Sequence, residues 1–232
     1  MKIALLGYGR MGKTIEQIAL QRGHQIVTKA MDDNYDISDA DVAIDFSIPS
    51  AAFKNISNCF NKNVPVISGT TGWLEDYDKA VALCEEKKGA FIYASNFSLG
   101  VNIFFELNSY LAKMMNTLKD YKVSMEEIHH TQKLDAPSGT AITLADAIIK
   151  EHDGYTSWDL DPKTEAALPI TAKRIKDVPG THSISYKSDV DTIDITHTAH
   201  SRQGFALGAV VAAEWLHGKT GVFTMKDVLN IS

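Results

Sequence analysis

Cysteine is scarce in this chain, and the few thiols lack any pattern of chemical use. Cys59 and Cys84 are the two cysteines among 232 residues, and neither belongs to a CxxC pair or to a Cys/His set with metal-ligand spacing. Isolated cysteines of this kind predict reduced thiols in a cytoplasmic protein. His182, His197 and His200 also lack close ligand spacing, so we expect them on sheet faces and predict no metal site.

Long hydrophobic runs and an excess of positive charge are missing as well. No apolar segment approaches the length needed to cross a bilayer, and the first residues read as a strand instead of a signal peptide. The formal net charge of -6 argues against a general nucleic-acid-binding protein, because binding to phosphate backbones depends on excess Lys and Arg. The length allows a full core in one large or two small domains.

The beginning of the chain has the pattern of a dinucleotide-binding domain. A short apolar strand leads into a G-x-G-x-x-G turn, and a helix is predicted over residues 13–22. In this arrangement the turn and the start of the helix bind the pyrophosphate of the cofactor. The predicted cofactor-binding residues of the turn are Gly7, Tyr8, Gly9, Arg10, Met11 and Gly12.

An acidic pair follows the second predicted strand, residues 25–31. Asp32 and Asp33 stand about twenty residues beyond the turn, where an acidic side chain is expected to contact the adenine ribose. Which of the two makes that contact stays open. Arg10 and Lys29 add cations nearby, and a cation there accepts the 2′-phosphate that aspartates repel. The predicted cofactor is therefore NADH or NADPH.

Strands alternate with helices as far as residue 99. This alternation predicts an α/β fold with a doubly wound parallel sheet, in which ligands bind beyond the C-terminal ends of the strands. The expected strands include residues 41–47, 64–68 and 90–98, and the expected helices 50–61 and 74–88. The predicted cofactor-binding residues at the strand ends are Gly69, Thr70, Thr71, Ala94, Ser95, Asn96 and Phe97, with Ser47 beside them. Residues 69–72 have a second interpretation as a simple turn.

The pattern changes after Gly100. A helix over residues 101–118 carries a stripe of Phe, Leu and Met that is predicted to lie in a core, and a strand follows at residues 121–130. The polar stretch 151–169 is predicted to be a mobile or irregular connection. Alternation predicts two antiparallel strands, 181–187 and 190–200. The last helix, 205–217, and a short helix or turn at 223–229 are expected to have no sheet of their own and to pack on the first domain.

The segment of residues 125–141 concentrates groups that can do chemistry. Its two histidines are adjacent, so in a strand they point to opposite faces. A lysine follows, and then a Ser-Gly-Thr turn begins a helix whose free amides suit a carboxylate or phosphate. A proton donor beside a cation and an anion site suits general acid catalysis. The residues are His129, His130, Lys133, Ser138, Gly139 and Thr140. Alternatively, the serine is an ordinary helix cap and the histidines hydrogen-bond within a loop.

These motifs together resemble the 4-hydroxy-tetrahydrodipicolinate reductase family, also called dihydrodipicolinate reductase. The resemblance rests on the glycine turn at the start, the Gly-Thr-Thr-Gly turn at 69–72, the Ala-Ser-Asn-Phe-Ser strand end at 94–98 and the His-His-x-x-Lys-x-Asp-Ala-Pro-Ser-Gly-Thr block at 129–140. Residues 195–202 and the closing helix also resemble the family, so the similarity spans essentially the whole chain.

The resemblance implies an NAD(P)H-dependent enzyme of lysine and diaminopimelate biosynthesis. It implies a Rossmann-like domain from residues 1–99 and 203–232, and an α+β domain from 100–202 with a mixed sheet that binds substrate and forms a homotetramer. His129 and Lys133 would serve acid catalysis. His130 and the turn of Ser138, Gly139 and Thr140 would hold the carboxylates of the substrate.

The chain departs from the family in three places, one of them Met31-Asp32-Asp33, where many members have a clear acidic residue ending the second strand; two rival functions stay open. It is shorter than many members before Arg174, and Gly180-Thr181-His182 replaces the usual Gly-Glu-His. One rival is another Rossmann dehydrogenase acting on a sugar or a semialdehyde. The other is a sensor that binds NAD(H) without turnover, which would show no substrate-dependent oxidation of NADH.

Overall fold

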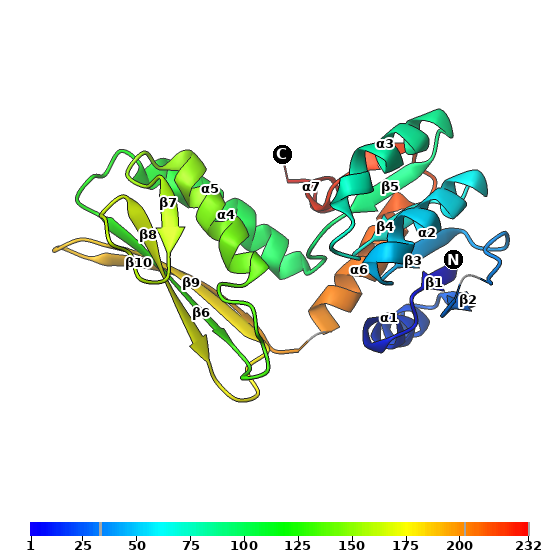
Figure 1. Cartoon of the computed structure of the whole chain (residues 1–232), viewed down its shortest axis with the longest axis horizontal. Coiled ribbons are helices and arrows are strands. Elements are labelled where there is room, and N and C mark those ends of the chain that lie inside the picture. Colours follow the sequence, from blue (N-terminus) through cyan, green and yellow to red (C-terminus); the bar gives the residue numbers. More distant parts are fainter. Residues whose placement is uncertain (33, 202, 232) are drawn as a thin grey trace. The chain divides into compact units, whose positions relative to one another are not determined.

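The computed structural model of the protein consists of two compact units (Figure 1). The structure describes residues 1–32, 34–201 and 203–231. Unit 1 comprises Met1–Leu99 with Gln203–Ser232, and unit 2 comprises Gly100–Arg202. Within the described ranges, every helix is too short or too polar to cross a bilayer.

Unit 1 contains a six-stranded sheet in which all neighbouring strands are parallel. Its strands in spatial order are β11 (Gly221–Phe223), β5 (Ala90–Tyr93), β4 (Val66–Ser68), β3 (Val42–Asp45), β1 (Lys2–Leu6) and β2 (Gln25–Ala30). The direction in which the chain adds strands reverses between β1 and β3. In parallel α/β sheets this reversal point, at the C-terminal strand ends, is where ligands bind.

Helices cover both faces of this sheet, because consecutive residues of a strand point to opposite sides. Ile3 and Leu5 of β1 lie in one apolar cluster with residues of α1 (Arg10–Gln21) and α6 (Gln203–Leu216). Ala4 and Leu6 lie in a second cluster with α2 (Pro49–Asn61) and α3 (Tyr77–Glu86). The single turn η1 (Leu74–Asp76) precedes α3, and α7 (Met225–Leu229) follows β11. The predicted doubly wound, Rossmann-like sheet is confirmed.

The chain end contributes more to unit 1 than the sequence pattern indicated. β11 pairs in parallel with β5, with Gly221 opposite Ala90 and Phe223 opposite Ile92. The sequence pattern did not predict this strand, although the end of the chain has no sheet of its own, as expected. Three residues are too few to show alternation, so the pairing depends on a partner strand far away in the sequence.

Close packing of α6 on the segment after β5 depends on a glycine. A Cβ atom added to Gly208 would lie 1.7 Å from the backbone oxygen of Phe97. On the same helix, a Cβ added to Gly204 would meet one atom of the described residues within 4 Å, the Ser98 hydroxyl oxygen at an ordinary 3.6 Å. The two glycines therefore have opposite packing environments within one helix.

We expect Gly208→Ala to lower the free energy of unfolding by about 3 kcal/mol, since the backbone must move to relieve the overlap. Gly204→Ala, as the matched control, should leave stability unchanged or raise it by up to about 1 kcal/mol, because alanine favours a helix. Urea unfolding of both variants followed by circular dichroism measures the difference. Equal free energies of unfolding in the two variants would show that α6 can shift to accommodate the methyl group without cost.

Unit 2 is a mixed five-stranded sheet with two helices on one face. The strands in spatial order are β10 (Thr192–Ala199), β9 (Gly180–Lys187), β6 (Lys122–His129), β8 (Ala167–Arg174) and β7 (Ser157–Asp159). β6 pairs with β8 in parallel and with β9 antiparallel. The helices α4 (Leu99–Met115) and α5 (Gly139–Glu151) share an apolar core with residues such as Met125 and Ile184. The predicted mixed-sheet α+β domain is confirmed.

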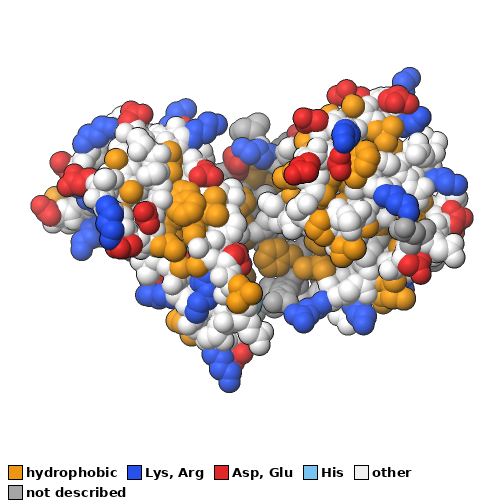
Figure 2. Space-filling view, viewed as in Figure 1, with side chains coloured by type: hydrophobic (Ala, Val, Ile, Leu, Met, Phe, Trp, Pro, Cys, Tyr) orange, Lys and Arg blue, Asp and Glu red, His pale blue; other side chains and the backbone are white. Residues whose placement is uncertain are grey.

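Two details of unit 2 differ from the sequence-based expectation. The stretch 151–169 contains β7 and the start of β8 instead of being wholly irregular. The apolar stripe of α4 divides between two faces: Phe104, Leu111 and Met115 are buried, whereas Leu107 and Met114 remain exposed. Hydrophobic side chains gather over α4 in Figure 2. A helix that is apolar around much of its circumference cannot be assigned one buried face from spacing alone.

Candidate functional site

A cavity in unit 1 lies at the point where the strand order reverses. Its volume is about 400 Å³. The residues that line it follow β1, β2 and β3 or belong to α2: Gly7, Tyr8, Gly9, Ala30, Met31, Asp32, Phe46, Ser47, Ile48, Ala51 and Asn55. It therefore contains part of the predicted glycine turn together with the acidic position after β2.

The three glycines of the turn have different structural roles. A Cβ on Gly7, whose φ is +93°, would lie 2.1 Å from the Phe46 oxygen, and one on Gly12 would lie 2.4 Å from the Gly7 oxygen. Both positions therefore need glycine for packing of the chain on itself. A Cβ on Gly9 would meet no atom of the described residues within 4 Å. Gly9 leaves open space at the N-terminus of α1, where a pyrophosphate of a dinucleotide fits.

A buried polar network supports the floor of this cavity. The Asp45 carboxylate is fully buried and accepts hydrogen bonds from Ser47, Asn55, Ser68 and Thr70 at 2.7 to 2.9 Å. Burial raises the pKa of Asp45, and these four donors oppose the rise. Because its hydroxyl donates to Asp45, the Thr70 side chain holds the segment after β4 against the end of β3.

The remaining predicted cofactor residues differ in accessibility. Asp32 is exposed and accepts a hydrogen bond from the Asn34 amide at 2.9 Å, while Asp33 lies outside the described residues. Lys29 pairs with Glu16 at 2.6 Å and lies over the Tyr8 ring, 4.9 Å from its centre. At the sheet edge, Arg10, Thr71 and Ser95 are exposed, Met11, Gly69, Ala94 and Asn96 are half-buried, and Phe97 is buried. Their contacts with a cofactor stay predictions.

The open space at Gly9 predicts an effect on binding with little effect on folding. Gly9→Ala should weaken NADH binding by about 1 to 3 kcal/mol, roughly 5- to 150-fold in Kd, because the methyl group occupies the space of the pyrophosphate. The thermal midpoint should fall only slightly, because a Cβ at Gly9 would meet no atom of the described residues within 4 Å, and the backbone there, at φ -81° and ψ -152°, lies near the edge of the extended region. Fluorescence titration with NADH and a melting curve measure the two effects. Undiminished affinity would place the pyrophosphate elsewhere.

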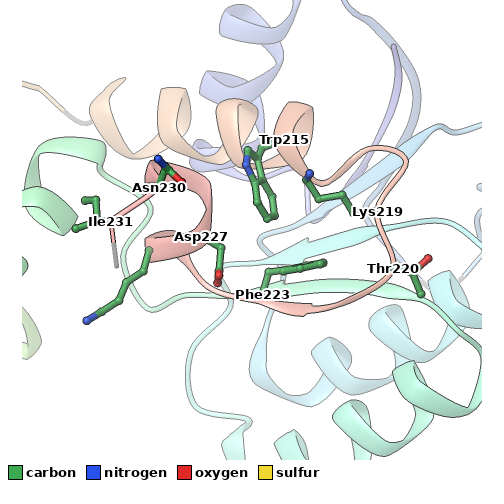
Figure 3. Close-up of a pocket in the computed structure, with 8 residues that line it drawn as sticks. Trp215, Lys219, Thr220, Phe223, Asp227, Asn230 and Ile231 are labelled. Atoms are coloured by element: carbon green, nitrogen blue, oxygen red, sulfur yellow. The ribbon is translucent and has the colours of Figure 1, made fainter.

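A second cavity of unit 1, of about 470 Å³, lies near the chain end and contains none of the predicted residues (Figure 3). Its polar groups are already engaged: the Lys219 ammonium lies 4.2 Å from the centre of the Trp215 ring, and the Asp227 carboxylate accepts hydrogen bonds from Thr224. These contacts make it a structural feature of the α6–α7 region.

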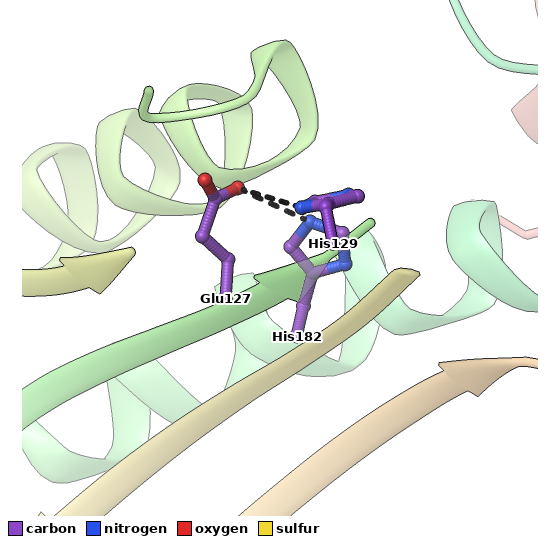
Figure 4. Close-up of side chains that lie close together, drawn as sticks. All are labelled: Glu127, His129 and His182. Carbon is purple, nitrogen blue, oxygen red and sulfur yellow. Dashed lines mark ion pairs between the residues drawn. The ribbon is translucent and has the colours of Figure 1, made fainter. Parts of the chain in front are cut away.

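The chemically richest site in unit 2 is a buried cluster of Glu127, His129 and His182 (Figure 4). Glu127 and His182 are directly opposite each other in the β6–β9 pair, and His129 follows Glu127 by two residues, on the same face of β6. The Glu127 Oε2 atom is 3.5 Å from His129 Nδ1 and 3.8 Å from His182 Nε2. We refer to these three residues as the histidine–glutamate cluster.

The cluster adjoins the N-terminus of α5. The Ser138 amide donates to Glu127 Oε2 at 3.0 Å, and the Ser138 hydroxyl accepts from the Ala141 amide and lies 3.2 Å from His182 Nε2. Ser138 is therefore a helix cap, as the alternative interpretation held, and also part of the polar site. Hydrogen bonds within the helix begin at the Ile142 amide. The amides of Gly139 and Thr140 have no acceptor among the described residues, so they can bind an anion.

Arg174 fixes the loop between β6 and α5. Its guanidinium donates to Glu127 Oε1 at 3.1 Å and to the backbone oxygens of Lys133 and Asp135 at 3.3 and 2.6 Å. The Lys133 ammonium donates to both carboxylate oxygens of Asp135, at 2.7 and 2.9 Å. The arginine thus ties the predicted catalytic loop to the buried glutamate. His130 faces different surroundings and lines a cavity of about 380 Å³ with Lys176.

Burial governs the protonation of the cluster. It lowers the pKa of His129, although the Glu127 charge opposes the effect, and it lowers the pKa of His182 to about 4. Burial by itself would raise the pKa of Glu127, but hydrogen bonds from Ser138 and Arg174 and the neighbouring His129 hold it below its usual value. At neutral pH the cluster therefore combines one carboxylate with two neutral imidazoles.

Glu127, Arg174 and His182 were absent from the sequence-based candidates, and His182 was expected merely to decorate a sheet face. It is instead 6% exposed and packs its ring against His129, with centroids 5.1 Å apart. The register of β6 and β9 brings it there, and no local spacing encodes that register. One usable signal was present: Glu127 occupies an inward position in an alternating strand, where a charge needs partners.

Comparisons with known proteins agree over the whole chain. Two family models match, described as dihydrodipicolinate reductase, N-terminus, over residues 26–97, and dihydrodipicolinate reductase, C-terminus, over residues 100–229. A 4-hydroxy-tetrahydrodipicolinate reductase of Christiangramia forsetii is 63% identical, covering 99% of this chain and 98% of the relative. One of Neisseria gonorrhoeae is 32% identical, covering 100% and 98%.

Solved structures show the same fold. A dipicolinate-bound dihydrodipicolinate reductase from Paenisporosarcina sp. TG-14 superposes with a TM-score of 0.81 at 22% identity, covering 97% of each chain. An aspartate semialdehyde dehydrogenase II from Vibrio cholerae reaches 0.54 at 13% identity, covering 93% of this chain and 97% of its own. With both family models and full-length relatives in agreement, the chain belongs to the dihydrodipicolinate reductase family.

Proposed function

We propose that the protein catalyses the NAD(P)H-dependent reduction of 4-hydroxy-tetrahydrodipicolinate to tetrahydrodipicolinate, in diaminopimelate and lysine biosynthesis. The 63% identity to a reductase of that name over nearly the full chain carries this proposal. The cavity at the glycine turn of unit 1 and the histidine–glutamate cluster of unit 2 support it, because they offer a dinucleotide site and a proton-handling site. The reaction consumes one proton and releases water.

The substrate is a cyclic imine with two carboxylates, and the start of α5 suits one of them. The amides of Gly139 and Thr140 and the positive end of the helix dipole favour an anion. Gly139 is exposed, and a side chain there would meet no atom of the described residues within 4 Å, so the backbone is open to close approach. Lys133 adds positive charge beside this turn. These contacts orient the ring of the substrate.

The proton is proposed to come from His129. The nicotinamide cofactor supplies the hydride, and negative charge then develops on the conjugated part of the ring. A neutral His129 must first gain a proton, and a bound dianionic substrate favours this by raising its pKa. Glu127, next to Nδ1, stabilises the resulting imidazolium. The geometry therefore supplies a donor that is charged when the substrate is present.

A coupled assay tests the proposal. Purified protein is mixed with substrate generated by the preceding synthase, and the loss of dihydronicotinamide absorbance is followed with NADH and with NADPH separately. We expect substrate-dependent oxidation with at least one coenzyme and none with aspartate semialdehyde. A protein that binds NADH but never oxidises it would be the sensor, and turnover of the semialdehyde would identify the other rival.

A cytoplasmic homotetramer completes the proposal. Both cysteines are free and buried, which suits a reducing compartment. β10 stands at an edge of the mixed sheet, with Ile193 38% exposed, and an exposed strand edge favours pairing between copies. Light scattering should give four times the chain mass of 25.5 kDa. A monomer mass at assay concentration would refute the assembly without affecting the proposed reaction.

A further inference from the structure

The histidine–glutamate cluster has the composition of a transition-metal site. Glu127, His129 and His182 each offer one donor atom, and all three donor atoms lie within 4.8 Å of one another. Two imidazoles and one carboxylate form a common donor set for zinc, and three protein ligands leave a fourth position for water or substrate. All three side chains are at least nine-tenths buried, with exposures of 0%, 8% and 6%.

The distances fit a tetrahedral ion without rearrangement of the backbone. Bonds of about 2.0 to 2.2 Å place neighbouring donors roughly 3.4 Å apart. The separations of 3.5 and 3.8 Å from Glu127 Oε2 to the two imidazoles are close to this value. The donor nitrogens of the two imidazoles lie within 4.8 Å of each other, and rotation of the two rings, inclined at 71°, about their side-chain bonds adjusts this distance.

An independent observation points into the same space. His129 Nδ1 is buried and has no hydrogen-bond partner among the described residues. Buried polar atoms nearly always have a partner, so an unpaired nitrogen aimed at a carboxylate marks a place where a proton or a cation is missing. The Glu127 Oε1 atom accepts from Arg174, and Oε2 accepts from the Ser138 amide; these two bonds hold the carboxylate in position and leave a second lone pair of Oε2 to coordinate an ion.

The positive charges near the cluster lower its affinity for a divalent ion but do not exclude binding. Lys133 has its own counter-charge in Asp135, whereas Arg174 shares the Glu127 carboxylate with the proposed ion through the other oxygen. The two thiols cannot compete, since Cys59 and Cys84 are buried in unit 1 and burial raises the pKa of both. The imidazoles are the softer donors, which favours zinc or cobalt over magnesium.

We infer that Glu127, His129 and His182 form a binding site for one divalent transition-metal ion of the zinc class, and that its occupation blocks His129. Coordination occupies the Nδ1 lone pair and fixes the ring beside Glu127, so the imidazole is no longer free to act as the acid of the proposed reaction. The ion therefore acts as an inhibitor. Binding stands on the geometry of the cluster alone, whereas inhibition also rests on the proposed function.

Direct observation of the two histidines in the wild-type protein tests binding. Histidine-selective nitrogen NMR of the full chain, recorded during titration with zinc chloride, should show saturable shifts at His129 and His182 at one equivalent, among eight histidines. Cobalt chloride should produce a visible spectrum of tetrahedral cobalt without thiolate bands. Shifts confined to exposed histidines such as His217, or a spectrum of octahedral cobalt, would overturn the inference.

A variant pair separates this site from surface binding. His182→Gln should weaken zinc binding by more than the roughly 10- to 100-fold typical for loss of an outer-shell partner. His217→Gln, on an exposed residue, should bind zinc as the wild type does. Calorimetric titration measures both, after circular dichroism confirms folding. If His182→Gln fails to fold, the wild-type NMR result decides. Equal zinc affinity in both variants would contradict the site.

A separate activity measurement tests whether zinc bound at this site inhibits the reaction. Zinc should abolish substrate-dependent NADH oxidation in the wild type, a chelator should restore it, and NADH binding should be unchanged. Zinc that binds at one equivalent without inhibiting would refute the block on His129 and leave the site intact. An enzyme that needs zinc for turnover would contradict the inhibition, whereas a protein without turnover both with and without zinc would contradict the proposed function; in either case NMR would still report the metal site.

Discussion

Replacing His129 by glutamine is expected to lower kcat by about 10²- to 10⁴-fold, the usual contribution of a positioned general acid. Glutamine keeps much of the side-chain volume and can hydrogen-bond, but it cannot donate a proton to a carbanionic centre. NADH affinity should stay within about twofold of the wild type, because the dinucleotide cavity belongs to unit 1 and His129 to unit 2. Steady-state kinetics and NADH titration give the two values.

His217→Gln is the matched control, since His217 is exposed on unit 1 at the end of α6. It should retain wild-type kcat and wild-type NADH affinity. A His129→Gln enzyme with unchanged kcat, or with kcat and cofactor affinity reduced equally, would contradict the role given to this imidazole.

Replacing Glu127 by alanine should give a large loss of stability in unit 2. The substitution leaves the Arg174 guanidinium and the Ser138 amide without their acceptor, and breaking a buried pair in this way costs about 3 to 5 kcal/mol. We expect the lower end of the range, because the Arg174 side chain is 21% exposed and can recruit water. Activity should also fall, since Arg174 no longer holds the loop of Lys133.

The neighbouring residue provides the control for this experiment. Glu126 is adjacent in β6 but points to the opposite face, where it pairs with Lys173 at a partly exposed position. Glu126→Ala should lower the free energy of unfolding by no more than about 1 kcal/mol, as expected for exposed ion pairs. Urea unfolding of both variants measures the contrast. Equal losses would show that the buried hydrogen bonds add nothing beyond the charge.

The architecture of unit 1 was largely predictable because its signals are local. The glycine turn, the short apolar runs that contain strands β1 to β5 and the helices between them each carry a pattern within a short window. β11 was missed because three residues hold no period, and it exists only by pairing with β5. The position of α6 against Phe97 likewise depends on Gly208, whose need for close contact has no sequence signature.

The candidate site was only partly predictable for a related reason. His129, Lys133 and Ser138 lie within ten positions of one another, so the local sequence alone indicates a site. Glu127 is equally close, but a second glutamate in a strand reads as a solvated charge until its burial is known. Arg174 and His182 reach the site through strand pairing with β6, and a register between distant strands follows from the complete fold.

The participation of both chain ends in one sheet affects how this protein is made on the ribosome. When translation has reached residue 202, all of unit 2 exists, but unit 1 still lacks α6, whose Ala209 and Val210 cover Ile3 and Leu5. The first segment to emerge must therefore wait with an apolar face uncovered while about a hundred later residues are added and fold. A nascent chain stalled before residue 203 should accordingly bind chaperones through its earliest strands.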